Sequence, residues 1–540
     1  MPEKETQSAL LVRKNEQGRL ELTSDGHEAL EPIVTNTTAQ VYAFRKDKNS
    51  RYAAGGMARL SRSENDMRTI IAGEFLTKET GSDALLTRVI GEYGDDSVAQ
   101  LDHDQIVFEG VSNVMTKKIE RGRLAAYLEQ STRYLRFDVK DAEGRYRYVT
   151  PSEFDEETAA EFEKNMDEIF DIYSELYIKA FEHIKNTSKE PESKRNRAWE
   201  TACHAQACDA VRGLLPNATK STVGVSASAQ AVYNMILHLE SEPLAEAKDL
   251  GAAALDAVRI VNPVFYTRAD NPNRGGLISA NKAQTRAESR ELAKGLIEEY
   301  ADSIEEETGP SVSLLSTSGS ERELLAKILI DHSDISYAKA LTVVDKLDEE
   351  GKAKILDTYV GERDNRRVKP GRSYELIHYF FEGVCDIGAW RDIQRHRPVD
   401  ALEAQNYQPY LGHSRPELID KIGGTELYER AFELSQKTYE MIADKGLEEQ
   451  AQYATLLGHH VRFSFAMNAR ELYHASELRT AVQGHASYRR FYQDMVNLVE
   501  EQHPFITKHM IFLNKDDNAE LARLDAERAL QARMAELGKA

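Results

Sequence analysis

The chain carries two incomplete copies of one arginine-rich pattern, and each copy keeps residues that the other lacks. The first copy contains Arg121, Gly122, Arg123, Glu129, Ser131, Arg133 and Tyr134. The second contains Arg395, His396 and Arg397, with Gln405, Tyr407 and Gln408 at the later serine, arginine and tyrosine positions. Arginine forks commonly bind phosphates and carboxylates. The division therefore predicts two fused, subunit-like halves that share a site.

Other segments repeat in the same order. The tetrapeptide FEGV occurs at Phe108–Val111 and at Phe381–Val384, and a helix-like run follows each copy up to its arginines. If the two copies are aligned on this tetrapeptide, the second needs one extra residue. Its glycine lies 11 residues before the first arginine in the first copy and 12 residues before it in the second. Farther on, Ser228–Glu240 resembles Asn468–Thr480. Repeats of this length predict a duplicated domain rather than a solenoid.

Composition fits a globular enzyme with an anionic surface. A length of 540 residues predicts two or three domains. The formal net charge of -21 argues against nucleic-acid partners and anionic membranes, so an anionic substrate would need a local cationic pocket. The polar first 20 residues and the absence of an 18-residue apolar run predict neither a signal peptide nor a membrane span. We therefore expect a cytoplasmic protein.

The three cysteines, Cys203, Cys208 and Cys385, form no CxxC pair and have no metal-ligand spacing. Buried, reduced thiols are expected, with neither a disulfide framework nor a zinc site. The pair His459-His460 lacks a third ligand at a suitable spacing, so no metal is predicted there.

Turn-forming residues and periodicity give a provisional organisation. We expect a polar arm at 1–38, a first domain at 39–268 with a helical insert at 151–194 that has no counterpart, a helical and linker segment at 269–320, a second domain at 321–504 and a C-terminal helix at 505–540. Periodicity alone predicts a helix-rich α/β chain, with long helices near 64–77, 153–185, 226–240, 283–306, 321–348, 425–445 and 465–500.

Polar residues alternate in the first arginine copy. If this segment is extended, Glu129, Ser131 and Arg133 project from one face and offer a carboxylate, a hydroxyl and a guanidinium to a polar ligand. The alternative is a solvent-facing strand edge with a Glu/Arg pair. Arg212, in a turn-like setting, is a further candidate phosphate contact.

The second copy offers cations in a row. Repulsion among Arg395, His396 and Arg397 would be relieved by an anion, although a solvated helix end explains them equally well. Asn468 and Arg479 are 11 residues apart, which places them on one helical face. Asn468 with Glu471 also fits a capping box, a structural role.

Several common catalytic motifs do not occur in the sequence. There is no GxxxxGK[ST], no GxGxxG after a strand, no HExxH and no GxSxG. P-loop enzymes, Rossmann reductases, zincins and α/β-hydrolases therefore lose their usual sequence support.

These residues together resemble the signature RHRxxSxNExSxRY of flavin-dependent thymidylate synthases. In the first copy Gly122, Ala126 and Leu128 replace its histidine, serine and asparagine. Two further patterns of the family lie downstream. The first, NAREL followed by a leucine-arginine step, resembles Asn468, Arg470, Glu471, Leu472, Leu478 and Arg479. The second, an arginine before a leucine-proline step, resembles Arg212 and Pro216. The resemblance covers most of both halves and implies two tandem copies of that family's fold.

The resemblance also implies an activity. Members of this family are homotetramers of an α/β domain with sites where subunits meet, and they bind FAD, deoxyuridine monophosphate, methylenetetrahydrofolate and NADPH. They convert deoxyuridine monophosphate to thymidine monophosphate by reductive methylation. No protein nucleophile is needed, which agrees with the absence of an activated Cys or Ser motif.

Residue roles follow from the same resemblance. Arg479 and Glu129 would act in catalysis, with Arg479 stabilising charge that develops on the pyrimidine. The substrate-binding residues would be Ser131, Arg133, Tyr134, Arg212, Arg121 and Arg123. The cofactor-binding residues would be Arg395, His396, Arg397, Asn468, Arg470 and the serines that precede each copy, Ser97 and Ser373.

The complementary losses predict a composite site. A dimer of this chain would then mimic the family's tetramer, with half the usual number of functional sites. Two alternatives remain: an inactive or repurposed homologue that binds flavin or nucleotide as a regulatory or scaffold protein, and a flavin enzyme that acts on another nucleotide.

Overall fold

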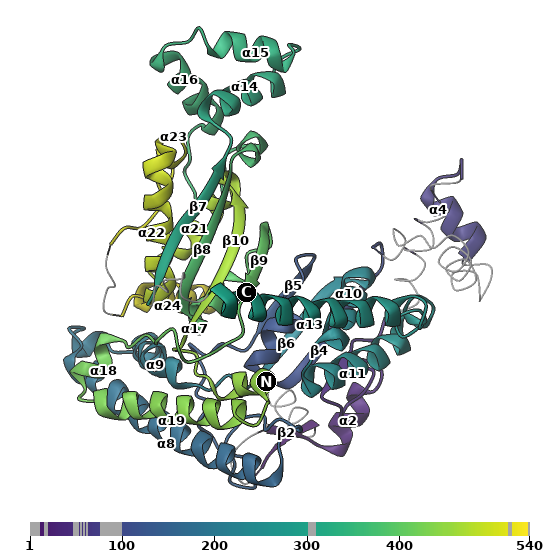
Figure 1. Cartoon of the computed structure of the whole chain (residues 1–540), viewed down its shortest axis with the longest axis vertical. Helices are drawn as coiled ribbons and strands as arrows, with labels where there is room; N and C mark the ends of the chain where they lie inside the picture. Colours follow the sequence, from purple (N-terminus) through teal and green to yellow (C-terminus); the bar gives the residue numbers. More distant parts are fainter. Residues whose placement is uncertain are drawn as a thin grey trace.

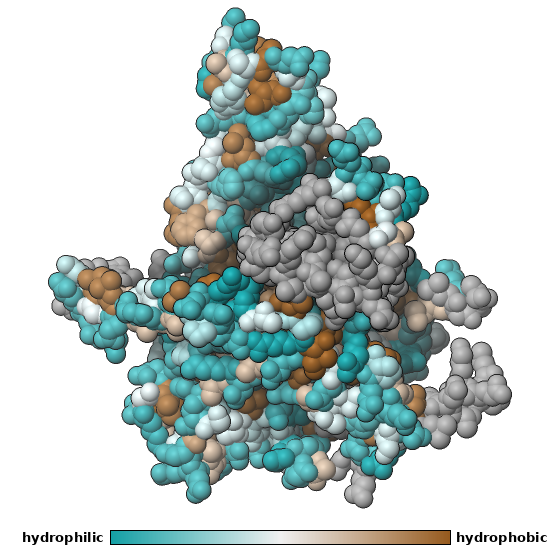
Figure 2. Space-filling view, turned by 90° about the vertical axis from the view of Figure 1, so that its right-hand side faces the viewer, coloured by the Kyte–Doolittle hydropathy of each residue, from teal (hydrophilic) through white to brown (hydrophobic). Residues whose placement is uncertain are grey.

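The computed structural model describes residues 11–15, 20–46, 53, 57, 60, 63–75, 100–300, 309–516 and 521–537. Two four-stranded antiparallel sheets with helices packed around them dominate this part of the chain, which confirms the helix-rich α/β class (Figure 1). None of the described helices is both long enough and apolar enough to cross a bilayer. The face seen in Figure 2 is mostly hydrophilic, with hydrophobic residues in small separate groups.

The two sheets share one topology. The first has the order β3-β4-β6-β5, with strands β3 (Val41–Ala43), β4 (His103–Ser112), β5 (Ala125–Glu129) and β6 (Lys220–Ser228). The second has the order β7-β8-β10-β9, with strands β7 (Ser311–Ser318), β8 (His378–Asp386), β9 (Val399–Ala404) and β10 (His460–Asn468). In both, the last strand in sequence lies between the second and the third. This shared order confirms the tandem repeat.

Helices lie between and after the strands in both halves. The first half contains α7 (Asn113–Ile119), α8 (Glu156–Thr187), η2 (Glu192–Lys194), α9 (Arg197–Val211), η3 (Arg212–Leu214), α10 (Ala229–Ser241), α11 (Ala245–Val261), α12 (Pro263–Tyr266) and then α13 (Gly275–Tyr300). The second contains α14 (Glu321–Asp331), α15 (Tyr337–Val344), α16 (Glu349–Val360), η5 (Arg372–Leu376), α17 (Ile387–Ile393), α18 (Glu417–Lys421), α19 (Thr425–Ala443), α20 (Glu448–Ala451), η6 (Gln452–Ala454), α21 (Ala469–Arg479), α22 (Ala486–Gln502) and α23 (Pro504–Thr507).

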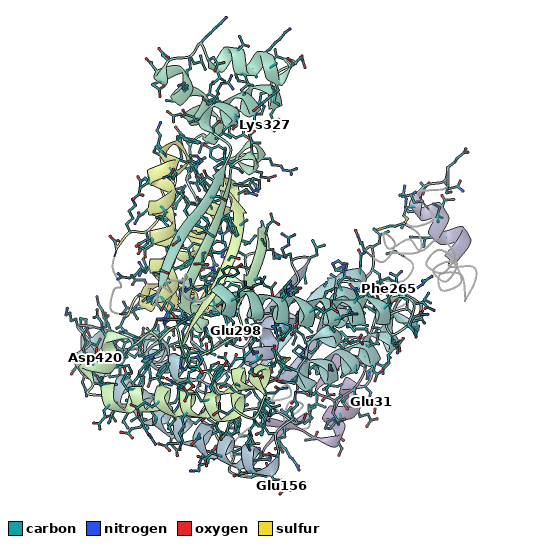
Figure 3. The ribbon with its side chains drawn as sticks, viewed as in Figure 1. Glu31, Glu156, Phe265, Glu298, Lys327 and Asp420 are labelled. Carbon is teal, nitrogen blue, oxygen red and sulfur yellow. The ribbon has the colours of Figure 1, made fainter. Side chains whose placement is uncertain are left out.

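Further elements lie near the ends of the sequence. They are β1 (Val12–Lys14), β2 (Leu20–Leu22), α2 (Ser24–Leu30), α4 (Met67–Ile70), η1 (Ile71–Phe75) and, after the second half, α24 (Leu524–Leu537). The helices α14–α16 lie beyond one end of the second sheet, so that Lys327 on α14 and Asp420 on α18 are at opposite ends of this half (Figure 3).

Alternating burial explains the central strands. In β6 every second residue, including Val223 and Val225, is buried, and β10 has the same pattern with Phe463 and Phe465. This period of two is that of a strand with one face on a core. The three cysteines are free and buried, as predicted.

Helix caps give the register of the repeat. Ser112 and Asp386 cap α7 and α17 by accepting backbone N–H groups, and each stands nine residues before the first arginine of its copy. No extra residue is therefore needed in the second copy.

The FEGV match itself is out of register. Val223 in β6 and Phe463 in β10 occupy equivalent positions. Val223 pairs with Phe108, whereas Phe463 pairs with Gly383. Phe108 is therefore equivalent to Gly383 and not to Phe381. A bulge in β4 shifts the first copy by one residue, and Gly110 takes a left-handed φ of 63° there. The tetrapeptide is a coincidence within a genuine repeat.

Four expectations about local structure are wrong. Residues 309–320 are not a linker, because β7 pairs with β8 along its length. The helix expected at 321–348 is interrupted between α14 and α15, and the one expected at 465–500 is replaced by the end of β10, α21 and α22. The insert at 151–194 has a counterpart, since α8 and α19 both follow the third strand of their sheet. The two helices pack against each other, and Asn165 Nδ2 donates to Thr438 Oγ1 at 3.0 Å.

Other helix predictions agree with the structure. The segments 153–185, 226–240 and 425–445 correspond to α8, α10 and α19. Residues 283–300 of the segment 283–306 lie in α13, and residues 301–306 are outside the described residues. Of 64–77, residues 76 and 77 lie outside the described residues.

The halves meet with reciprocal hydrogen bonds. The Asn217 N–H donates to Thr455 O at 2.7 Å, and the Leu457 N–H, at the matching position, donates to Leu215 O at 2.9 Å. Such an exchange is the mark of an isologous, two-fold interface. The single chain thus has the internal arrangement of a symmetric dimer.

Candidate functional site at the junction of the two halves

The signature arginines join the two halves in the same reciprocal way. Arg395 Nη2 donates to Glu129 at 2.8 Å, and Arg121 Nη2 donates to the matching Glu403 at 2.6 Å. The next arginines bind backbone carbonyls of the opposite strand: Arg397 binds Ala125 O at 3.2 Å and Arg123 binds Val399 O at 3.0 Å. Each half therefore places its arginines against β5 or β9 of the other.

Glu129 is the centre of a buried charge cluster. Arg391 and Arg395 of the second half donate to its carboxylate at 2.5 and 2.8 Å, and Lys117 Nζ lies 3.2 Å from it. Burial alone would raise the pKa of this carboxyl, but Arg391, Lys117 and Arg395 outweigh burial and hold the pKa of Glu129 well below its usual range. Glu129 is therefore ionised, and the alternative of a solvent-facing strand edge is wrong for this residue.

The extended segment expected after Glu129 does not continue. β5 ends at Glu129, and residues 132–134 form a turn in which the Arg133 N–H donates to Ser131 Oγ at 3.2 Å. Arg133 makes a bidentate pair with Asp209, with both N···O distances 2.8 Å, and its Nη1 donates to Tyr488 Oη at 3.0 Å. The turn thus directs Arg133 toward the second half.

Arg479 is oriented by a histidine and two acids. Its Nε donates to His396 Nε2 at 2.9 Å and its Nη1 donates to Asp392 at 2.9 Å. Because His396 Nε2 accepts this bond, the ring proton is on Nδ1, which donates to Glu471 at 2.9 Å. Burial lowers the pKa of His396, which agrees with a neutral ring.

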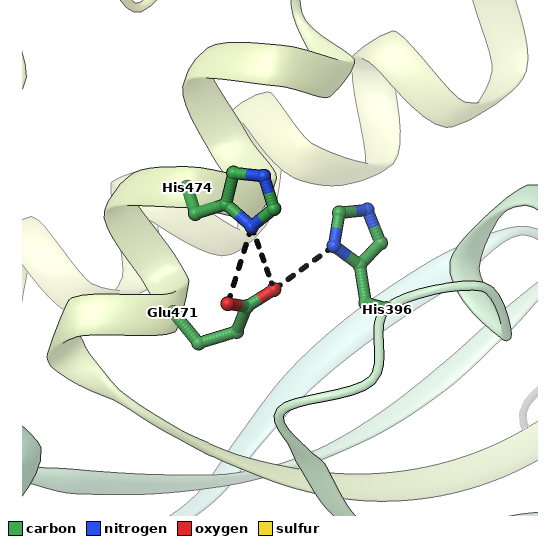
Figure 4. A group of neighbouring side chains, drawn as sticks. All are labelled: His396, Glu471 and His474. Carbon is green, nitrogen blue, oxygen red and sulfur yellow. Dashed lines mark hydrogen bonds and ion pairs between the residues drawn. The ribbon is translucent and has the colours of Figure 1, made fainter. Parts of the chain in front are cut away.

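The group His396, Glu471 and His474 brings its ligand atoms within 4.8 Å of one another (Figure 4). Sequence reasoning missed this cluster. His474 Nδ1 lies 3.2 Å from both Glu471 oxygens. Since the Arg479 guanidinium already uses His396 Nε2, the arrangement is that of a hydrogen-bond network that fixes Arg479.

Tyr488 contacts both Arg133 and Arg479. The Cζ atoms of Arg133 and Arg479 are 5.7 and 5.5 Å from the centroid of its ring. An arginine from each half of the chain therefore contacts the same aromatic side chain.

A cavity of about 950 Å³ opens beside this junction. Arg133 and Arg212 line it from the first half, and the ends of β7 and β8, the segment 413–421 and the segment 482–487 line it from the second. Arg212 is 4% exposed, and its Nη2 has no hydrogen-bond partner among the described residues, with Asp386 at 3.8 Å. Burial lowers the pKa of Arg212. A buried, unsatisfied guanidinium favours an anionic ligand.

The other predicted residues lie elsewhere. Asn468 caps α21 by accepting the Glu471 N–H at 2.9 Å, and Arg470 binds Pro370 O at 3.0 Å. Ser373 is buried and donates to Asp331 at 2.6 Å. The Tyr134 ring lies under Arg523, with the guanidinium carbon 4.8 Å from its centroid. Ser97 is outside the described residues.

The matching location on the opposite side of the repeat lacks these cations. Tyr407 stands at the position of Arg133, and Gln452 begins η6 as Arg212 begins η3. Both are buried, and the Tyr407 N–H donates to Gln452 Oε1 at 3.1 Å. The cationic pair is therefore present once in each chain.

Several contacts were missing from the sequence prediction. Arg391 lies one helical turn before Arg395 and occupies the position that matches Lys117 in the first half. Arg391 and Lys117 both bind Glu129, and this equivalence in the repeat could have indicated it. Asp209, Tyr488 and Arg523 gave no such signal, because they reach the site only through the tertiary fold.

Comparison with known proteins agrees with the repeat. The family "Thymidylate synthase complementing protein" matches residues 44–264 and 314–505, one region in each half. A UPF0159 protein of Chlamydia pneumoniae is 30% identical over 94% of this chain and 98% of its own, and a UPF0159 protein of Thermoplasma acidophilum is 28% identical over 87% and 97%.

Two further proteins match part of the chain. A flavin-dependent thymidylate synthase of Clostridium tetani is 27% identical over 27% of this chain and 53% of its own. A solved structure of the UMP/dUMP methylase PolB from Streptomyces cacaoi, bound with 5-Br dUMP, covers 40% of this chain and 100% of its own, with 16% identity and a TM-score of 0.31.

Proposed function

Because the chain belongs to the thymidylate synthase complementing protein family, we propose that it converts deoxyuridine monophosphate to thymidine monophosphate, with methylenetetrahydrofolate and NADPH as co-substrates and FAD as cofactor. The observation that carries this proposal is the joining of the two halves at the signature residues: Glu129 binds Arg391 and Arg395, and the guanidinium groups of Arg133 and Arg479 both contact Tyr488.

The cavity fits a nucleotide or flavin in size and charge. Its volume of about 950 Å³ is near the upper end of the ~300–1,000 Å³ found for ligand and cofactor sites. Arg212 supplies the unsatisfied buried donor, and Arg133 a second guanidinium. Bound FAD would supply hydride transfer between NADPH and the pyrimidine.

Protein groups would bind and polarise rather than attack. Arg133 and Arg212 would bind the nucleotide phosphate. Arg479, fixed by His396 and Asp392, would stabilise negative charge that develops on the pyrimidine, because its donors are already oriented. We infer that Arg395 and Arg397, which are exposed, complete the flavin side of the site where two chains meet. The three buried free thiols suit a reducing cytoplasm.

The direct test is release of tritium from deoxyuridine monophosphate labelled at the methylated carbon, with NADPH and the folate supplied. Purified protein should also be yellow from bound flavin. Release that depends on both co-substrates is expected. Protein loaded with FAD that releases no tritium would contradict the proposal.

One observation favours a second candidate, a homologue that binds nucleotide or flavin without turnover. Arg133 is already held by Asp209, Tyr488 and the Gln483 carbonyl, which leaves few of its donors for a phosphate. In that case dUMP or FAD would bind with no tritium release under any combination of co-substrates.

A further inference from the structure

The C-terminal segment forms one wall of the cavity. Leu521, Ala522 and Arg523 line it, although the family match ends at residue 505. This part of the site is therefore an addition to the repeated domains, and it brings a cation with it.

Arg523 reaches the same carboxylate as Arg133. Its Nη2 lies 2.8 Å from Asp209 Oδ2, the oxygen that also accepts from Arg133 Nη2 at 2.8 Å. The Arg523 side chain is 7% exposed, and its guanidinium stacks over Tyr134. Since Asp209 is shared, neither arginine is neutralised by a carboxylate of its own.

The segment is anchored on the first half. The Leu521 N–H donates to Gln206 Oε1 at 3.1 Å, Leu524 is buried, and α24 packs on α9. Farther along α24, Arg528 pairs with Glu190 at 2.5 Å and lies outside the cavity. The position of Arg523 thus results from packing on α9.

The balance of charge at the cavity is positive. Six cationic side chains line it, against four acidic ones, in a chain whose net charge is -21. The cationic ones are Arg133, Arg212, Arg415, Lys421, Arg490 and Arg523, and the acidic ones are Asp209, Asp386, Glu417 and Asp494. The unsatisfied Arg212 is one of three arginines near Asp209 and Asp386.

We propose that Arg523 is a specificity residue that binds the phosphate monoester of the nucleotide, together with Arg133 and Arg212. This inference rests on the proposed function for the identity of the nucleotide. A dianion suits three guanidinium groups that share two carboxylates, whereas an uncharged nucleoside would leave them without a counterion.

The test is calorimetric binding of dUMP, deoxyuridine and FAD to full-length protein without NADPH or folate. Arg523→Gln should weaken dUMP binding roughly tenfold or more, because it removes a charge-assisted bond, and leave deoxyuridine binding unchanged. Arg523→Lys should recover part of the loss. Arg528→Gln, the control from the helix α24 that follows Arg523, should bind both ligands as the wild type does.

Three outcomes would overturn the inference: unchanged dUMP affinity in Arg523→Gln, an equal loss for dUMP and deoxyuridine, or a selective loss for FAD instead of dUMP. An equal loss would show that Arg523 only supports the wall. Because the measurement needs no turnover, a protein that releases no tritium but loses dUMP affinity selectively in Arg523→Gln would contradict the proposed activity and still support the phosphate contact.

Discussion

At the scale of single residues, Arg133 and Arg479 are expected to be equally necessary. They come from different halves of the chain but contact one tyrosine, so each should contribute to the same site. We expect Arg133→Ala and Arg479→Ala each to lower tritium release at least about 100-fold at dUMP concentrations well below KM, the first by weakening dUMP binding and the second by removing a preorganised charge stabiliser. Arg145→Ala, at an exposed arginine paired with Asp141, is the control and should retain full activity.

Full activity in either variant would show that the two residues do not serve one site. Measuring dUMP binding beside turnover separates their roles. Arg133→Ala should mainly weaken binding, whereas Arg479→Ala should mainly lower kcat, because charge on the pyrimidine develops only during the reaction.

A second residue-scale prediction concerns acid stability. Burial, with repulsion from His413 and His460, lowers the pKa of His459 to about 3, and its Nδ1 accepts the Leu456 N–H. The unfolded chain, with a histidine pKa of about 6.5, takes up this proton first, so stability is lost as pH falls from about 6.5 toward 3.

The free energy of unfolding should therefore drop by about 2 kcal/mol from this group between pH 6.5 and 5. His459→Asn, whose side-chain oxygen can accept the same N–H, should be less stable at pH 7 but should lose less stability on acidification. Urea titrations at both pH values measure the difference. Parallel losses in the two proteins would place the acid sensitivity in other groups.

Sequence reasoning at this scale identified the residue types but not all their partners. Glu129, Arg395 and Arg479 belong to the recognised pattern, and their mutual contacts follow once the halves are joined. Asp209 and Arg523 are ordinary charged residues in sequence, and only the packing of α24 on α9 brings them together. The alternation through Ser131 and Arg133 failed because a turn replaces the strand.

At the scale of elements, the two FEGV segments show that the same residue type can be required for different physical reasons. Gly110 needs its left-handed φ of 63° in the β4 bulge, and an added Cβ would meet nothing closer than Lys220 at 3.9 Å. Gly383 has no such φ, but an added Cβ would lie 2.7 Å from Phe491 and 2.8 Å from Phe463. The first glycine is a backbone requirement and the second a packing requirement.

Substitutions separate these causes. Gly110→Ala should lower the free energy of unfolding by about 1 kcal/mol. Gly110→Asn should lower it less, because asparagine tolerates the left-handed region better than alanine does. At Gly383 the order should reverse: alanine should cost about 1–3 kcal/mol through overpacking and asparagine more. Denaturant unfolding of the four variants measures this. The same order at both positions would refute the distinction.

Long helices with clear periodicity were predictable, whereas β7 was not. Its sequence SVSLLSTS is rich in serine, and its residues are intermediate or exposed, as suits an edge strand whose one partner among the described strands is β8. Pairing with a strand more than 60 residues later is a nonlocal contact that local composition cannot reveal. The same holds for α19, whose correspondence to α8 depends on its position after the third strand.

At the scale of the whole molecule, the reciprocal contacts make one chain equivalent to two subunits. Only one side keeps the Arg133 and Arg212 pair, and the matching side has Tyr407 and Gln452. We therefore expect a dimer of the 60.9 kDa chain that binds one flavin per chain. Light scattering with absorbance measures both. A monomer, or two flavins per chain, would contradict this arrangement.

Mixing variants tests which residues act within a chain and which act between chains. Arg133 and Arg479 meet in one chain, so a mixture of Arg133→Ala and Arg479→Ala should remain inactive. Arg397 is exposed and does not line the cavity with Arg133, so it is expected to serve the partner chain. In a mixture of Arg133→Ala and Arg397→Ala, half of the dimers are heterodimers with one intact site, which gives about a quarter of wild-type activity. The two mixtures must be unfolded and refolded together so that chains exchange. If both remain inactive, Arg397 acts within its own chain, and the active unit is the single fused chain.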